Sequence, residues 1–444
     1  MKVGFAKVCI DPPYGAPMCG YYEERYVKGI HDSLYARATA FDDGETRAVV
    51  IAVDLCVLSL SFCNQVKSLI HDAVGIDENA IFINCSHTHT GPIIGKDFAS
   101  DNTSTGAYNA FLGGSIRDAA VYALSDLREA RIEIGSGEAK NISFIRRYRM
   151  KDGSVATNPG VNNPNIDHPL GTPNETVKLV KILREGADDI FIVNFGTHPD
   201  SVGGEYISAD FIGYVCSILE KAVPGTKCMY LMAPQGDVNH VNVKPTKGEA
   251  AISAINFDGV PRSHEHAKHM GRIIAGAVLS ICSVTEPVMT DKISFAMKSI
   301  DLPSHPENDR LEEARYIYDM YKAGRSAELP YKEMELTTAV AEATRIVKLE
   351  NGPASYPFLL SAIRIGNLVF AGIGGEPFTE IGNRICEGSP FDATILCCLT
   401  NNSGDYIPTS SAYNEGGYEA RSSFLAPGGD DIMVEGMVSL LKSL

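Results

Sequence analysis

The sequence Asn84-Cys-Ser-His-Thr-His-Thr-Gly-Pro92 follows the apolar run Ala80-Ile-Phe-Ile83. The apolar run is short and rich in strand-forming residues, which predicts a buried strand, and Gly91-Pro92 predicts a turn after it. Side chains two residues apart on a strand point to the same side of the sheet. We therefore expect His87 and His89 on one side, at the carboxyl end of this strand. Such a pair suits a zinc site, although most His-x-His pairs are ordinary surface or hydrogen-bonded histidines.

The segments before this stretch alternate between strand and helix patterns. Residues 30–41 and 47–54 have strand character and flank the turn signal Asp42-Asp43-Gly44-Glu45, which predicts a hairpin. Residues 59–74 have the apolar spacing of a helix. Strand, helix and strand in this order form a β-α-β unit, whose two strands are usually parallel. The sequence therefore predicts an α/β fold with a mixed, partly parallel sheet flanked by helices.

Later segments continue this pattern without an internal repeat or a linker, which predicts one domain over residues 1–444. Residues 141–175 are rich in Asn, Pro and Gly and predict a long functional loop. A charged helical pair is expected as an insertion at about 305–350. The remaining expected elements are helices over 106–130, 211–221 and 264–283, and strands over 131–135, 177–183, 190–195, 228–232, 361–365, 368–373 and 393–399.

Composition excludes several classes of function. The net charge of −16, with no basic cluster longer than Arg146-Arg147-Tyr148-Arg149, argues against nucleic acids or anionic membranes as partners. No apolar run approaches the roughly 20 residues that span a bilayer, and the N-terminus lacks the apolar core of a signal peptide. We therefore expect a cytoplasmic protein without stable membrane association. Its 11 cysteines are scattered without a C-x-x-C pair, which predicts free thiols.

Chemically capable side chains recur where the predicted strands end. In open α/β sheets, binding sites form where the carboxyl ends of strands meet. Polar loops alone explain one or two such residues, but they explain two imidazoles and a carboxylate less readily. Two histidines and a glutamate with an open position form a recurring catalytic zinc shell, to which a phenol oxygen could add a fourth ligand. Besides the histidine pair, the residues at strand ends are Asp54, His198, Asp237, Glu376 and Tyr406.

Several of these stretches resemble the neutral, non-lysosomal ceramidase family. The run Ser86-His-Thr-His-Thr-Gly-Pro92 is similar to the family's zinc signature, and weaker similarity extends, with gaps, from about residue 3 to residue 425. The resemblance implies one zinc ion per chain. The further stretches that carry it are Gly29-Ile-His31, Ala36-Arg37-Ala38, Asp54 and Gly375-Glu376, and the implied zinc ligands are His87, His198, Glu376 and Tyr406.

The resemblance also implies roles around the metal. His89 would hydrogen-bond the substrate or the water on the metal, and Arg146 would help to bind the reacting group, with Arg147 as an alternative. Tyr418 resembles a second active-site tyrosine of the family, although ordinary loop packing explains it equally well. The family's C-terminal immunoglobulin-like domain is not expected within the 444 residues.

One departure from the family bears on mechanism. Gly236-Asp-Val-Asn239 stands where ceramidases have Gly-Asp-x-Ser with a proposed nucleophilic serine, and asparagine cannot form an acyl-enzyme. Zinc lowers the pKa of a bound water to about 7, so metal-activated water could replace the serine. In this interpretation His89 or Asp237 moves protons, and Asn239 and His240 contact the substrate.

We therefore expect a zinc-dependent hydrolase that cleaves an amide, or an ester, in a small polar substrate. Hydrolysis of N-acylsphingosine by the same chemistry is one alternative. A catalytically silent metal-binding or ligand-binding protein is another. The sequence favours no particular oligomeric state.

Overall fold

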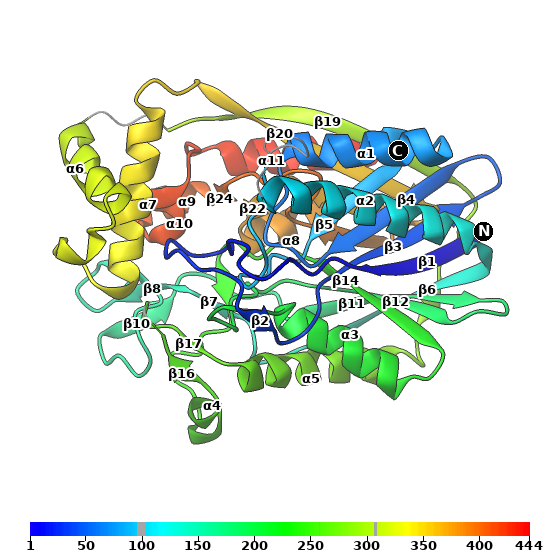
Figure 1. Cartoon of the computed structure of the whole chain (residues 1–444), viewed down its shortest axis with the longest axis horizontal. Coiled ribbons are helices and arrows are strands. Elements are labelled where there is room, and N and C mark those ends of the chain that lie inside the picture. The colour runs from blue at the N-terminus through cyan, green and yellow to red at the C-terminus, as the bar shows by residue number, and fades with distance from the viewer. Residues whose placement is uncertain (96–103, 257, 306–308) are drawn as a thin grey trace.

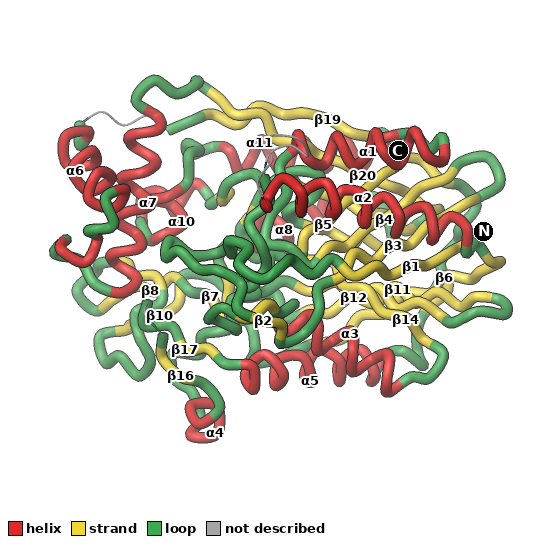
Figure 2. The backbone as a smooth tube through the Cα atoms, in the orientation of Figure 1, coloured by secondary structure: helices red, strands yellow, loops and turns green. Residues whose placement is uncertain are grey.

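The computed structural model describes residues 1–95, 104–256, 258–305 and 309–444, arranged as Figures 1 and 2 show. Its largest element is a nine-stranded sheet in the order β14-β12-β11-β6-β1-β3-β4-β5, with β18 also paired to β6. Parallel and antiparallel neighbours both occur, which confirms the predicted mixed sheet. The strands are β1 (Lys2–Cys9), β3 (Tyr35–Asp42), β4 (Arg47–Val53), β5 (Ile81–Cys85), β6 (Arg128–Glu138), β11 (Thr176–Arg184), β12 (Asp189–Phe195), β14 (Thr226–Met232) and β18 (Glu286–Pro287).

The β-α-β unit before the histidine pair forms as predicted. β3 and β4 make an antiparallel hairpin, α1 (Leu60–Val74) follows, and β5 runs parallel to β4. The Ser59 side chain caps α1 by accepting a hydrogen bond from the Phe62 N–H. Gly75 ends the helix at φ 68°, a left-handed conformation that glycine adopts without steric cost.

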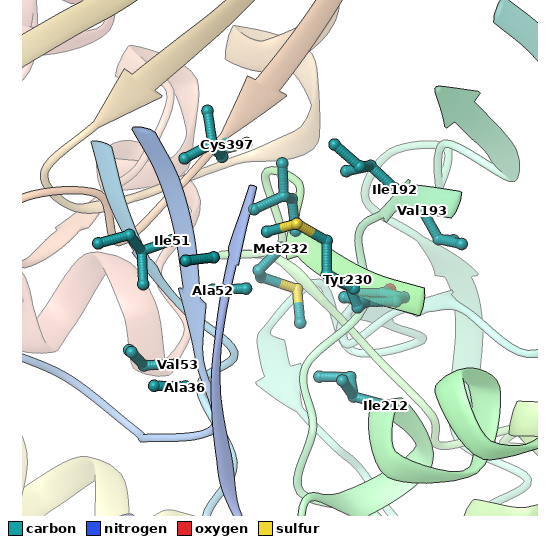
Figure 3. Close-up of a cluster of buried hydrophobic side chains, with 14 of the residues drawn as sticks. Ala36, Ile51, Ala52, Val53, Ile192, Val193, Ile212, Tyr230, Met232 and Cys397 are labelled. Atoms are coloured by element: carbon teal, nitrogen blue, oxygen red, sulfur yellow. The ribbon is translucent and has the colours of Figure 1, made fainter. Parts of the chain in front are cut away.

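A second, four-stranded sheet shares the core with the first. Its order is β19-β20-β21-β23, and apolar side chains from both sheets form one buried cluster. Figure 3 shows part of this cluster, where Ile51 and Met232 of the large sheet lie near Cys397 of the small one. The strands are β19 (Ile293–Pro303), β20 (Ser355–Ile365), β21 (Leu368–Ile373) and β23 (Ala393–Cys397).

Helices cover the sheets on several sides (Figure 1). α1 and α2 pack together beside β1 and β3, α3 and α5 pack together beside β14 and β6, and α8 and α11 cover the second sheet. The predicted helical pair is present as α6 and α7 at one end of the molecule. Within the described residues, no helix is long and apolar enough to span a bilayer. The helices not yet delimited are α2 (Ser104–Ser125), α3 (Asp210–Ala222), α4 (Lys247–Ala251), α5 (His264–Ile281), α6 (Leu311–Lys322), α7 (Glu333–Leu349), α8 (Thr379–Gly388), α9 (Ser410–Glu415), α10 (Tyr418–Ser422) and α11 (Gly429–Lys442).

Three predicted elements are corrected. The helix expected over 106–130 ends at Ser125, because Arg128 already pairs with β1 as part of β6. The strand expected over 30–41 is split into β2 (Gly29–Ile30) and β3. The expected loop over 141–175 contains short strands that pair with one another or with β15, so local hydrogen bonding orders it. The remaining short strands are β7 (Phe144–Ile145), β8 (Arg147–Met150), β9 (Val155–Thr157), β10 (Ile166–Pro169), β13 (Tyr206–Ile207), β15 (Val238–Asn239), β16 (Ala254–Ile255), β17 (Pro261–Arg262), β22 (Glu376–Pro377) and β24 (Tyr406–Ile407).

Asn84 holds together the strand ends that carry the chemistry. It is fully buried in β5, and its side-chain amide donates to the Cys398 carbonyl at 2.6 Å. Its side-chain oxygen accepts a hydrogen bond from the Met232 N–H at 2.8 Å. One asparagine therefore links the ends of β5, β14 and β23, which brings their following loops to one place.

The buried Lys67 on α1 gives a stability prediction. Its Nζ lies 3.7 Å from the Met297 sulfur, and no carboxylate of the described residues lies within 4 Å of it. Burial lowers the Lys67 pKa to about 8, so the charged form destabilises the fold at neutral pH. We expect Lys67→Met to raise the free energy of unfolding at pH 7 by about 2–3 kcal/mol.

The pH dependence fixes the sign of this effect. The destabilisation is fully present below pH 8 and is relieved as the pH rises toward the unfolded-state pKa of about 10.4. The advantage of Lys67→Met over the natural chain should therefore shrink over that range in urea unfolding experiments. Lys140→Met, at an exposed lysine, is the control. Equal stability of the natural chain and Lys67→Met at pH 7 would contradict the assignment.

Candidate active site and metal centre

Three imidazoles converge where the β5 and β12 loops meet. Nε2 of His87 lies 3.1 Å from Nε2 of His198 and 3.4 Å from Nε2 of His89, and the His198–His89 distance is 3.1 Å. All three side chains are buried. The convergence was expected, but its cause differs from a continuing strand. β5 ends at Cys85 and His87 adopts a left-handed φ of 68°, so the loop conformation, rather than strand alternation, aims both rings.

A carboxylate completes the cluster. Glu376 begins β22, and its Oε2 lies 3.3 Å from Nε2 of His87 and 4.0 Å from Nδ1 of His198. Gln235 bridges the two sides, because its amide nitrogen donates to Glu376 Oε2 at 3.0 Å while its oxygen contacts Nδ1 of His198. One ligand atom each from His87, His198 and Glu376 lies within 4.8 Å of the other two.

Burial and neighbouring charges set the protonation of the cluster. Burial and the nearby His87 hold the pKa of His89 well below its ordinary value, and burial and Arg146 do the same for His198. Burial disfavours the charged form of His87 as well. The Glu376 carboxylate favours that form more strongly, so the pKa of His87 is raised. Burial likewise opposes ionisation of Glu376, yet His87 and Gln235 lower its pKa. The cluster thus offers two imidazoles held neutral, His89 and His198, beside the His87–Glu376 pair.

These residues fit a metal ion. The His87 tautomer with its proton on Nδ1 donates to the Cys56 carbonyl at 2.9 Å, which leaves the Nε2 lone pair facing inward. Contact with Gln235 orients His198 in the same sense. Neutral imidazoles that present lone pairs to one another at 3.1–3.4 Å cannot all be satisfied by hydrogen bonds, whereas a cation between them satisfies them. Cys56 lies next to the cluster as well, because one ligand atom each from Cys56, His87 and His89 lies within 4.8 Å of the other two.

Tyr406 and Arg146 adjoin the carboxylate. Parallel pairing of β22 with β24 sets Tyr406 directly opposite Glu376. The Arg146 guanidinium lies 5.4 Å from the centre of the Tyr406 ring and 6.0 Å from that of Tyr418, and its Nε lies 2.5 Å from Glu419 Oε1. The two tyrosine rings meet edge to face at 5.8 Å. Burial raises the pKa of both phenols well above the ordinary value, so they remain hydrogen-bond donors.

A pocket opens onto this cluster. Five of the predicted site residues line this pocket: His89, His198, Arg146, Tyr406 and Tyr418. The cavity holds about 60 Å³. The remaining lining residues are mostly polar or aromatic: Gly20, Tyr21, Tyr22, Asn158, Asp200, Asp258, Arg262, Met334 and Thr337.

Comparison with known proteins agrees with this geometry. Residues 2–253 match the family model of neutral/alkaline non-lysosomal ceramidase, N-terminal. The chain belongs to this family. Its members are hydrolases that act on amide bonds.

Two solved structures share the fold of this ceramidase-family chain. The neutral ceramidase from Pseudomonas aeruginosa matches with a TM-score of 0.72 and 19% sequence identity, covering 100% of this chain and 75% of the other. A ceramidase complexed with C2 matches with a TM-score of 0.73 and 16% identity over the same shares of the two chains.

Three predicted residues lie elsewhere than expected. The Asp237 carboxylate accepts 2.7 Å hydrogen bonds from the N–H and the hydroxyl of Thr379, so it fixes the start of α8 and does not line the pocket. Asn239 is fully buried behind the wall, donating to Asn158 at 3.0 Å. His240 is also buried, with Nε2 2.8 Å from the Pro261 carbonyl oxygen. None of the three therefore lines the pocket, and each supports a neighbouring residue. The roles of Asp237 in proton transfer and of Asn239 and His240 in substrate binding stay predictions.

The structure also decides between the two arginines. Arg147 donates to Glu415 and to the Gly416 carbonyl, both at 2.9 Å, and lines a different cavity together with Asp237. Arg146 faces the tyrosines and the imidazoles. The geometry therefore favours Arg146 over Arg147 for the role beside the cluster.

Several residues of the site were missed from the sequence. Gln235 follows a buried strand, so the strand-end pattern that singled out Asp237 also contained it. Asp200 comes two residues after His198 and forms an ion pair with Arg262 at 3.1 Å. Met334 and Thr337 belong to α7, and no local pattern indicates that this helix reaches the pocket.

Proposed function

We propose that this chain is a zinc-dependent amidohydrolase that acts on a small hydroxylated or charged N-acyl substrate. The observation that carries the proposal is the convergence of three buried imidazoles and the Glu376 carboxylate beneath a polar pocket. His87, His198, Glu376 and Tyr406 would hold the metal. Zinc bound there supplies Lewis-acid catalysis and lowers the pKa of a water molecule, so no serine nucleophile is needed.

The surrounding side chains perform the remaining tasks. The Arg146 guanidinium and the phenol of Tyr418 line the pocket, where they can donate hydrogen bonds to a carbonyl oxygen as negative charge develops on it. His89 is neutral and faces both the pocket and the cluster, so it can take a proton and return it to the leaving amine. Glu419 holds Arg146, and Gln235 holds His198 and Glu376, which keeps the donors in place.

The pocket walls support a small polar substrate. Asp258 and Asp200 share the Arg262 guanidinium, and Asn158 adds an amide, so the wall offers hydrogen bonds. Among the residues that line the pocket, Met334 is the one with a non-aromatic apolar side chain. Breaking the hydrogen bonds among these polar groups to admit an alkyl chain would cost about 1–3 kcal/mol for each buried group left unpaired.

Substrate comparison tests this proposal. We expect kcat/KM of purified, zinc-replete protein to be higher for N-acetylated amino sugars or N-acyl amino acids than for long-chain ceramide. Glu376→Gln, which removes the negative charge at the metal position, is the control for enzyme-dependent turnover. A higher kcat/KM for long-chain ceramide would favour the lipid alternative. No hydrolysis of any amide or ester by protein with its zinc in place would favour the silent binding protein.

Asn239 gives a separate mechanistic prediction. Its side chain supports Asn158 in the pocket wall, so Asn239→Ala should lower kcat/KM by about tenfold, the effect of one lost buried hydrogen bond. Glu376→Ala, by contrast, should lower it by a factor on the order of 10³ or more, because it removes a charged ligand. Mass spectrometry after a rapid quench should find no acyl group on the protein. A covalent adduct on any side chain of the 236–241 loop would refute catalysis by water.

A further inference from the structure

Outside the active-site pocket, His31, Asp32 and His264 form a second group of metal-ligand side chains. One nitrogen or carboxylate oxygen from each lies within 4.8 Å of the other two. His31 and Asp32 directly follow β2, and His264 is the first residue of α5. Figure 1 shows β2 near α3 and α5 on the same side of the molecule. The proposed hydrolytic reaction uses none of the three residues.

The two imidazoles lie against each other. Their rings stack with centroids 3.4 Å apart and planes inclined by 19°. Nε2 of His31 lies 3.0 Å from the Tyr214 hydroxyl, and with the proton on Nε2 the lone pair of Nδ1 is left available. Nδ1 of His264 is buried and has no hydrogen-bond partner within the described part of the chain.

Asp32 contributes a negative charge without a basic partner. Its Oδ2 accepts a hydrogen bond from the Ser208 hydroxyl at 2.5 Å, and its Oδ1 accepts one from the Ala209 N–H at 2.8 Å. No lysine or arginine nitrogen of the described residues lies within 4 Å of this carboxylate. A bound cation would give this carboxylate a positively charged partner.

We propose that His31, Asp32 and His264 bind a second divalent cation of the zinc type. Two imidazoles and one carboxylate favour zinc, cobalt or nickel over magnesium or calcium, which prefer oxygen ligands. The ligand atoms already lie within 4.8 Å of one another, and rotation of the exposed His31 ring out of the stack is required for bonds of about 2.0–2.2 Å to one ion, with water in the fourth position. The N-terminal ends of α3 and α5 disfavour a cation, but their partial charges are small beside the full charge of Asp32. Because His31 is exposed, we expect binding weaker than at the buried cluster.

The second site connects to the loop that carries the catalytic histidines. Ser208, which donates to Asp32, also accepts hydrogen bonds through its carbonyl from the hydroxyls of Thr88 (2.7 Å) and Thr90 (3.0 Å). These two threonines flank His89. A cation that fixes Asp32 therefore also fixes Ser208 and, through it, the loop over residues 86–90.

Zinc titration tests the second site without reference to turnover. The probe is Zn²⁺ alone, added to dialysed protein that retains the ion of the buried cluster and followed by calorimetry. We expect one further equivalent to bind, with at least tenfold weaker binding in His264→Ala and in His31→Ala. His71→Ala, at a histidine of α1, is the matched control and should bind like the natural chain. Amide hydrogen exchange at residues 86–90 should slow severalfold when this equivalent binds, except in the two site variants.

The outcome separates this proposal from the proposed function. Failure of the further equivalent to bind, or its undiminished binding in either site variant, would overturn the second site and leave the buried cluster untouched. Retention of the first equivalent and of the circular dichroism spectrum shows that the variants are folded. Loss of the first equivalent through His87→Ala leaves the expected second equivalent unchanged.

Discussion

His87→Ala is expected to lose the tightly bound zinc ion and to lower amide hydrolysis by a factor on the order of 10³ or more. The reason is geometric: Nε2 of His87 lies within 3.4 Å of two imidazole nitrogens and of the Glu376 carboxylate, so it stands at the centre of the cluster. Metal content after dialysis, measured by mass spectrometry alongside turnover, checks both expectations. The control is His168→Ala, whose exposed imidazole contacts Asp167 away from the cluster. Full zinc occupancy in dialysed His87→Ala would refute the ligand assignment.

Gly20→Ala is expected to lower kcat/KM although Gly20 contacts none of the proposed zinc ligands. A Cβ at Gly20 would lie 2.6 Å from Cβ and Cγ of His89, closer than atoms can approach. His89 must therefore move, and a displacement near 1 Å at a catalytic group costs about 10²-fold in rate. We expect kcat/KM to fall by about that factor while zinc content stays unchanged.

The matched control is Gly15→Ala. Gly15 also has a positive φ, 79° against 107° at Gly20, but a Cβ there would meet nothing within 4 Å. Both variants carry the backbone cost of a left-handed alanine, about 1–2 kcal/mol, and only Gly20→Ala carries the clash. Equal kcat/KM for the two variants would show that the position of His89 does not matter for the reaction.

The sequence pattern located most of the candidate site residues that follow strands. Apolar runs followed by polar residues located His87, His89, His198, Glu376 and Tyr406, and the structure brings the first four together and pairs the fifth with Glu376. These strands are not neighbours in one sheet, and their ends come together because the two sheets pack against each other and Asn84 links the ends of β5, β14 and β23. The resemblance to the ceramidase family supplied Arg146 and Tyr418, which no strand pattern singled out. The chemical roles of all these site residues, the single-domain organisation and the cytoplasmic location stay predictions.

What the sequence missed depends on side-chain direction and on distant segments. Asp237 follows a strand like the others, but its carboxylate turns to Thr379, and sequence position does not reveal such a turn. Helix α7 looked like a plain surface helix from its charge pattern, yet Met334 and Thr337 close the pocket from more than 130 residues beyond His198. The Asx-rich 141–175 segment was mistaken for a loop because its short strands pair mainly with one another and have no apolar run.

The central claim is that hydrolysis depends on a metal held by this cluster, and zinc reconstitution tests it most directly. The protein is stripped with a chelator, zinc is returned in steps, and hydrolysis of an N-acyl substrate is measured at each step. We predict that the stripped protein is inactive and that activity rises linearly to a plateau at the first equivalent, with no recovery in Glu376→Gln. Hydrolysis by stripped protein at the rate of the untreated protein would contradict the account.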